Sequence, residues 1–127
     1  MLILALALPA SAQEAETGPP ASTRKGIYTV AQAERGKEIM RGVCAACHMD
    51  EEFMGTFIKS WAGASVGDLF DEVSTKMPED RPGSLRPRQY AQVLAYIFRL
   101  NGLPAGEVLM PSSIEELRKI IIEGSQG

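Results

Sequence analysis

The chain has 127 residues and no internal repeat, so it can form one domain around one core. Apolar residues make up 45% of the chain but aromatic residues only 6%, so a well-filled core needs bulk from some other source. The net charge of −3 argues against nucleic acid and anionic membrane surfaces as partners, and it permits docking to a basic protein surface.

The amino-terminal segment has the pattern of an export signal. Residues Met1 to Ala12 carry no charge, are mostly Leu, Ile and Ala, and end in the small-x-small pattern that signal peptidase cleaves. The apolar run is shorter than the roughly twenty residues that span a bilayer, so we expect no membrane anchor. Because the usual basic start is missing, we expect residues 1–12 to be a truncated signal peptide and the protein to be periplasmic. The alternative is a hydrophobic end without a targeting role.

The segment after this signal predicts a flexible leader followed by a helix. Residues 13–27 are rich in Glu, Gly, Pro, Ser and Thr, so we expect the folded domain to occupy residues 28–127. Thr29 and Gln32 have the spacing of a capping box, which predicts a helix from Val30 to about Gly42. Gly36 interrupts this helix at a cost of about 1 kcal/mol relative to alanine, so we expect a close packing contact there.

The middle of the chain predicts one further helix between two loops. Residues 49–64 show neither the helical nor the strand period and are predicted to be loop. Ser65 and Asp68 indicate the start of a helix, which should end before Pro78. Residues 78–87 hold three prolines and Gly83, and these predict a defined, non-helical loop.

The strongest helical pattern begins at Pro87, a residue that suits the first position of a helix. Its core-facing residues are Tyr90, Val93, Leu94, Ile97 and Phe98. This helix should end at Asn101-Gly102, with the glycine in a left-handed cap. Ser113 predicts a last short helix that Gly124 closes; its apolar side would carry Ile114, Leu117, Ile120 and Ile121. No segment has a convincing strand pattern, so the predicted fold class is all-α.

The sequence Cys44-Ala45-Ala46-Cys47-His48 is a C-x-x-C-H motif, which is the attachment motif of a covalent c-type haem. Thiols three residues apart on a helical turn can form thioethers with the two vinyl groups on one edge of a porphyrin, and the adjacent histidine then points at the iron. A disulfide couple and a zinc site are the alternatives. Zinc would need two further ligands, yet the chain has no other Cys or His, and no βαβ context supports a thioredoxin-like couple.

A haem that only carries electrons needs a second axial ligand, and His48 is the single histidine. Among the six methionines, Met77 is placed best, because it follows a predicted helix and directly precedes a proline whose fixed φ helps to hold the thioether. Met110 is the rival, since a proline follows it too. Met49 and Met54 lie too close to His48 in the sequence, and any one of these methionines can be a core filler instead.

In their order along the chain, these motifs resemble a class I c-type cytochrome over roughly Tyr28 to Glu123. The motifs are Arg35-Gly36, Cys44-Ala-Ala-Cys47-His48, Met77-Pro78 and Val93-Leu94-Ala95-Tyr96-Ile97. The resemblance implies a cytochrome c-like fold of three to five helices around one covalent haem, with Gly36 and Met40 packed against Val93 and Tyr96. Residues 77–85 and 96–106 resemble, more narrowly, the cytochromes that accept electrons from periplasmic quinoprotein alcohol dehydrogenases or sulfite dehydrogenases.

The resemblance also suggests two further haem-binding residues. The indole N–H of Trp61 could reach a haem propionate; the alternative is an apolar wall with the N–H bonded to backbone. Arg81, next to Arg86 and Arg88, could pair with a propionate or with a partner's acidic surface, although a solvated arginine face is the default.

The chain departs from the family in two places. It lacks the proline whose carbonyl commonly orients the proximal histidine, so we expect a backbone carbonyl between Phe53 and Gly55 to replace it. Arg86 stands where the family often has a capping serine, so we expect Ser84 to cap the strongest helix, or the cap to be weak.

The sequence thus predicts a soluble periplasmic one-electron carrier with His48/Met77 ligation, and not an enzyme. It would accept electrons from a dehydrogenase and pass them to a terminal oxidase or another cytochrome, as a monomer or as a subunit of a complex. One alternative is a fixed haem subunit of a dehydrogenase. Another is a haem enzyme or gas-binding protein with an open sixth position, although no histidine remains for a distal acid or base.

Overall fold

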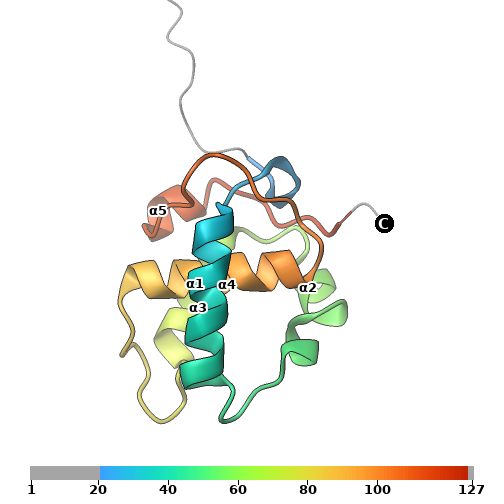
Figure 1. Cartoon of the computed structure of the whole chain (residues 1–127). Coiled ribbons are helices and arrows are strands. Elements are labelled where there is room, and N and C mark those ends of the chain that lie inside the picture. Colours follow the sequence, from blue (N-terminus) through green and yellow to red (C-terminus); the bar gives the residue numbers. More distant parts are fainter. Residues whose placement is uncertain (1–20, 126–127) are drawn as a thin grey trace, which may run out of the picture.

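The computed structural model describes residues 21–125, and within this range every regular element is a helix, which confirms the all-α class (Figure 1). The elements in chain order are η1 (Thr23–Lys25), α1 (Val30–Ile39), η2 (Met40–Cys44), η3 (Asp50–Phe53), α2 (Thr56–Trp61), α3 (Val66–Lys76), α4 (Pro87–Leu100) and α5 (Ile114–Leu117). Among these described helices, none has the length and apolar character that a membrane span requires.

The fold is organised around the crossing of α1 and α4, which Figure 1 shows near the centre of the molecule. The predicted capping box of α1 is confirmed, with the Thr29 hydroxyl accepting the Gln32 N–H at 3.2 Å and the Gln32 side chain accepting the Thr29 N–H at 3.1 Å. At Gly36 an added Cβ would lie 1.8 Å from the backbone oxygen of Gln92 and 3.0 Å from Cβ of Tyr96. The predicted close contact is therefore confirmed, and it leaves no room for a side chain.

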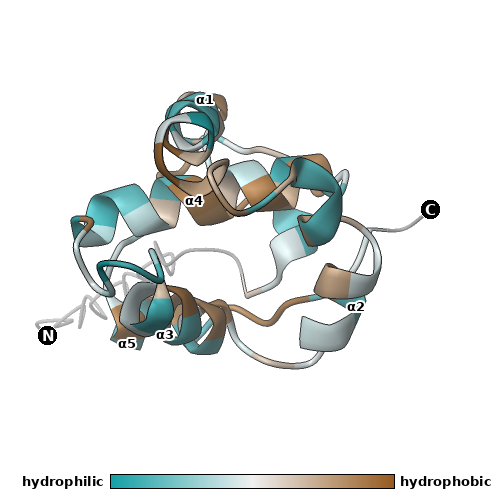
Figure 2. Ribbon diagram, turned by 90° about the horizontal axis from the view of Figure 1, so that it is seen from below, coloured by the Kyte–Doolittle hydropathy of each residue, from teal (hydrophilic) through white to brown (hydrophobic). Residues whose placement is uncertain are grey.

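Helix α4 supplies most of the core, and its hydrophobic residues lie in the middle of the molecule in Figure 2. Gly102 ends it with a φ of +70°, and the Leu103 N–H bonds to the Phe98 carbonyl at 3.0 Å, so the predicted left-handed cap is confirmed. At the other end, the Gln89 side chain accepts the Arg86 N–H at 2.9 Å. The expectation that Ser84 caps this helix is wrong, because Gln89 does so from within the first turn.

Helix α3 begins where the sequence predicts. The Ser65 hydroxyl accepts the Asp68 N–H at 3.0 Å, and the Asp68 carboxylate accepts the Ser65 N–H at 3.2 Å. Helix α5 packs beside α3 (Figure 2). The position of α3 in the fold is thus set by its cap and by α5.

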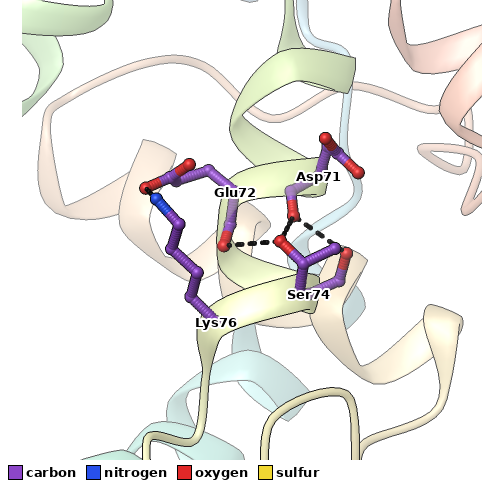
Figure 3. A network of polar contacts seen from close by, with 5 residues as sticks. Asp71, Glu72, Ser74 and Lys76 are labelled. Atoms are coloured by element: carbon purple, nitrogen blue, oxygen red, sulfur yellow. Dashed lines mark hydrogen bonds and ion pairs between the residues drawn. The ribbon is translucent and has the colours of Figure 1, made fainter.

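The last turn of α3 satisfies its own carbonyl groups, as Figure 3 shows. The Thr75 hydroxyl donates to the Asp71 carbonyl at 2.6 Å, and Lys76 forms an ion pair with Glu72 at 2.5 Å. The Met77 N–H closes the helix on the Val73 carbonyl at 2.9 Å. Met77 therefore stands at a defined helix end, as predicted.

Two predicted boundaries are wrong. Residues 49–64, predicted to be loop, contain η3 and α2; helices this short are stabilised by tertiary contacts and leave little periodicity in the sequence. The last helix ends at Leu117 instead of running toward Gly124. The chain beyond it is extended, with the Ile120 carbonyl accepting the Val66 N–H at 2.8 Å and the Ile122 N–H donating to the Ala64 carbonyl at 2.8 Å.

Residues 21–27, expected to belong to a flexible leader, pack against the carboxyl-terminal segment. The Thr23 N–H bonds to the Ile121 carbonyl at 3.1 Å, the Thr23 hydroxyl donates to the Glu123 carbonyl at 2.7 Å, and Ile27 is buried. The backbone and hydroxyl groups of this polar segment thus find partners that its composition did not indicate. The predicted signal peptide and the rest of the leader lie outside the described residues.

Candidate functional site

The C-x-x-C-H segment forms a tight turn that follows a widened helix. In η2 the Ala45 N–H bonds to the Met40 carbonyl at 2.8 Å, which is the spacing of a π-turn, a feature often found at functional sites. The Cys47 and His48 N–H groups then both bond to the Cys44 carbonyl, at 3.1 and 2.9 Å. One turn therefore carries both thiols and the imidazole, as the motif predicts.

Both cysteines are free thiols, and Cys44 is half-buried while Cys47 is exposed. Burial raises the pKa of the Cys44 thiol above its ordinary value. A redox-active disulfide couple instead depends on a thiol with a lowered pKa. The environment of Cys44 therefore disfavours the thioredoxin-like alternative.

A cavity of about 700 Å³ opens beside this turn, a volume typical of cofactor sites. Most of the side chains in its wall are apolar. The wall is formed by Met40, Val43, Cys44, Ala46, Cys47, His48, Glu52, Phe53, Phe57, Trp61, Leu69, Glu72, Val73, Lys76, Met77, Pro78, Glu79, Asp80, Val93 and Ile97. The structure thus brings Cys44, Cys47, His48, Trp61 and Met77 together around one hollow.

The structure separates the two rival methionines. Met77 is half-buried and lines the cavity, whereas Met110 is 2% exposed in the core and is absent from the cavity wall. Gln32 holds the backbone of Met110 from both sides, accepting its N–H at 2.9 Å and donating to its carbonyl at 3.0 Å. Met40 also lines the cavity, although the sequence assigned it to helix packing alone.

The two further haem-binding candidates differ in position. Trp61 is a half-buried part of the cavity wall, and its indole N–H forms no hydrogen bond with the described residues. Arg81 is exposed in the loop after Pro78 and does not line the cavity, although its neighbour Asp80 does. Only Trp61 therefore joins the cysteines and the histidine at the site.

A carboxylate, and not a backbone carbonyl, faces the free side of His48. Nδ1 of His48 lies 2.9 Å from Oε2 of Glu52, and Oε1 of Glu52 accepts the Met49 N–H at 3.0 Å. The hydrogen bond with His48, followed by that from Met49, lowers the pKa of Glu52 below its ordinary value. The expected carbonyl between Phe53 and Gly55 is wrong: the Phe53 carbonyl accepts instead from Asn101 at 2.7 Å. A glutamate four residues after a histidine is the signal that could have indicated this pair.

Helix α4 holds the segment that carries Glu52. The Tyr96 hydroxyl donates to Asp50 at 2.6 Å, and Asn101, besides its bond to Phe53, accepts the Gly55 N–H at 2.9 Å. The sequence assigned Tyr96 to packing and Asn101 to the helix end, so both roles were missed. These contacts fix η3 next to His48.

Helix α4 also holds the Met77 loop. The hydroxyl of Tyr90, a buried residue, donates to the Met77 carbonyl at 2.7 Å and accepts the Leu85 N–H at 3.3 Å. A hydroxyl both donates and accepts, so one side chain can close both ends of this loop. The sequence identified Tyr90 only as a core residue.

These residues fit a covalently bound c-type haem. The two thiols are free, the contact of Nδ1 with Glu52 leaves Nε2 of His48 available for iron, and the thioether of Met77 belongs to the same, mostly apolar, wall. The described residues contain no cluster of three or more His, Cys, Asp or Glu side chains that could hold a metal ion by itself.

Comparison with known proteins agrees with this chemistry. Residues 31–97 match the family described as cytochrome C oxidase, cbb3-type, subunit III. No curated protein and no solved structure matches the chain significantly. The matched range covers just over half of the chain and includes the C-x-x-C-H motif and Met77. The chain therefore belongs to the family of cytochrome c oxidase, cbb3-type, subunit III, and its domain is a c-type cytochrome, an electron-transfer domain with one covalent haem.

Proposed function

We propose that this protein is a periplasmic one-electron carrier with His48/Met77 ligation, which accepts electrons from a dehydrogenase and delivers them to an oxidase or another cytochrome. The observation that carries the proposal is the shared cavity: both thiols, the imidazole of His48 and the thioether of Met77 line it. A Met/His ligand pair raises the reduction potential relative to other ligand sets, which suits an electron acceptor.

Each residue of the site has a distinct task. Cys44 and Cys47 form the thioethers that tether the cofactor to the chain, and Nε2 of His48 and the sulfur of Met77 ligate the iron. The haem supplies one-electron chemistry between Fe(III) and Fe(II). The aromatic wall, with Phe53, Phe57 and Trp61, excludes water, and the free indole N–H of Trp61 is available for a propionate.

The first test is the mass and visible spectrum of protein produced in cells that attach haem. We expect the polypeptide mass plus one haem, with a Soret band. Met77→Ala should abolish the weak red-edge band of Fe(III)–thioether ligation and lower the potential, while Met110→Ala should leave the band in place even if it destabilises the core. The opposite pattern would assign the ligand to Met110.

Carbon monoxide distinguishes the carrier from a gas-binding protein or haem enzyme. An electron carrier whose iron is closed by Met77 should not bind carbon monoxide readily when reduced, whereas Met77→Ala should. Ready binding by the unaltered protein would favour an open sixth position, and the proposal of a simple carrier would then be abandoned.

The family description favours a second candidate, a fixed haem subunit of an oxidase complex. The two candidates share the same site and differ in whether the domain diffuses. Purification from native membranes and from the soluble fraction at low protein concentration separates them. A stable, stoichiometric complex would support the fixed subunit, and recovery as a free monomer would support the diffusible carrier.

A further inference from the structure

The partner of His48 is unusual in its charge, and this inference rests on the proposed role of His48 as an iron ligand. A backbone carbonyl would present a neutral acceptor to Nδ1, whereas Glu52 presents a carboxylate at 2.9 Å. A carboxylate only accepts, so Nδ1 must carry the proton of this hydrogen bond. A charged acceptor makes a stronger hydrogen bond than a neutral one.

We infer that Glu52 is a positioning residue that tunes the haem iron through His48. The Nδ1–H···carboxylate bond fixes the ring and the tautomer, and it increases the electron-donating strength of Nε2. A stronger donor favours Fe(III) over Fe(II), so Glu52 holds the reduction potential below the value that His48 and Met77 would give with a neutral acceptor. Hydrogen bonding beyond the ligands is one of the means by which a protein sets a haem potential.

The structure holds Glu52 in place for this task. Its other carboxylate oxygen accepts the Met49 N–H at 3.0 Å, so the side chain is fixed at both oxygens. The one-turn helix that carries it is attached to α4 on both sides, through Asp50 to Tyr96 at 2.6 Å and through Phe53 to Asn101 at 2.7 Å. A glutamate held in this way keeps its hydrogen bond to His48 as the iron changes charge.

Local packing also protects the pair from solvent. The His48 side chain is 29% exposed, and its ring lies against that of Phe53 with 5.4 Å between centroids. Phe53 in turn meets Phe57 edge-on at 5.3 Å. Although Glu52 itself is 47% exposed, the Nδ1–H is covered on one side by these rings. Water therefore competes poorly for this proton.

The decisive variant is Glu52→Gln in the haem-loaded protein. A glutamine offers one acceptor and one donor group, so it can satisfy the N–H of His48 or that of Met49, but not both. We expect the reduction potential to rise in Glu52→Gln. In the NMR spectrum of the reduced protein, the Nδ1 proton of ¹⁵N-labelled His48 should move upfield and exchange faster with solvent than in the unaltered protein.

Two carboxylates serve as matched controls for the loss of one negative charge. Glu51 is an exposed residue of the same η3 turn, and Glu79 is an exposed residue that lines the cavity without an ion pair to any described residue. Glu51→Gln and Glu79→Gln should raise the potential less than Glu52→Gln does, and both should leave the Nδ1 proton of His48 unchanged.

The outcomes separate this inference from the proposed function. If the three variants shift the potential equally and the Nδ1 resonance stays in place in all of them, Glu52 is an ordinary surface charge and the inference is overturned. Should Glu52→Gln fold poorly, the downfield, slowly exchanging Nδ1 proton expected in the unaltered protein still decides the question. Absence of covalent haem or of the red-edge band would instead contradict the proposed function, before any variant is compared.

Discussion

The two loops that face the haem cavity are attached to the same helix by different means. On the His48 side, residues 49–55 contact α4 through Tyr96 and through Asn101, and these bonds reach Asp50, Phe53 and Gly55. On the Met77 side, the loop between α3 and α4 depends on one hydroxyl, that of Tyr90. The histidine side is thus fixed at several points, whereas the methionine side is closed by a single side chain.

This difference indicates which ligand is released first when the protein is perturbed. His48 is in addition part of the turn that carries both thioethers, so its position is set by covalent bonds once haem is attached. Met77 has only the end of α3 and Tyr90 to hold it. We expect mild denaturant or heat to remove the thioether from the iron before the imidazole.

A change in the helix crossing should disturb both loops together and have the largest effect. Gly36→Ala places a methyl group 1.8 Å from the backbone oxygen of Gln92, so α4 must move, at a cost of about 3 kcal/mol or more. Chemical denaturation monitored by circular dichroism measures this loss. Gly42→Ala is the control, because an added Cβ there meets nothing within 4 Å. Equal stability of the two variants would contradict the role of the crossing.

Loss of Asn101 should loosen the histidine side alone. Asn101→Ala leaves the Phe53 carbonyl and the Gly55 N–H without their partner, which should destabilise the protein by roughly 2 kcal/mol. Amide hydrogen exchange should increase over residues 50–55 and change less over 77–85. Asn101→Asp, which can still accept from Gly55, should have a smaller effect. Equal loosening of both loops would remove the distinction between them.

Loss of the Tyr90 hydroxyl should loosen the methionine side by a smaller amount. Tyr90→Phe removes the bond to the Met77 carbonyl and should cost about 1 kcal/mol. The red-edge band should then disappear at a lower denaturant concentration than global unfolding requires. Tyr28→Phe is the matched control, since it removes a buried hydroxyl bond to the Leu103 carbonyl at 2.5 Å, far from the Met77 loop in sequence. If both variants shift the band equally, Tyr90 has no special role.

The smallest effect is expected at the start of α3, where neither loop takes part. Hydrogen bonds from the Ser65 N–H and hydroxyl lower the pKa of Asp68 below its ordinary value. Its contribution to stability is therefore complete above the unfolded-state pKa and is lost as the pH falls through the folded-state value. The stability difference between the unaltered protein and Asp68→Asn should shrink over this acid range. A difference independent of pH would contradict this assignment.

The sequence predicts features that depend on neighbours along the chain. The caps at Thr29 and Ser65, the left-handed Gly102 and the C-x-x-C-H turn all follow from local spacing, and the structure confirms them. Gly36 announced a close contact because its cost demands one. A glycine in a helix thus conveys tertiary information.

The features that the sequence did not predict depend on groups far apart in the chain. Asn101 and Tyr90 each fit a local role, a helix end and a core position, so nothing marked their side chains as holders of the two loops. Glu52 lies near His48 in sequence, but its role appears only when η3 forms, and η3 is stabilised by α4. The carbonyl expected in its place was inferred from a family pattern that this chain lacks.

The pairing of the two ends of the described chain bears on how the domain acquires its fold. Bonds that join Thr23 and Ser22 to Glu123 connect residues 100 and 101 positions apart. Closing so long a loop costs entropy that only the finished core repays. During synthesis the amino-terminal segment must wait for the final residues of the chain, so this contact should form last, after the helices that surround the haem.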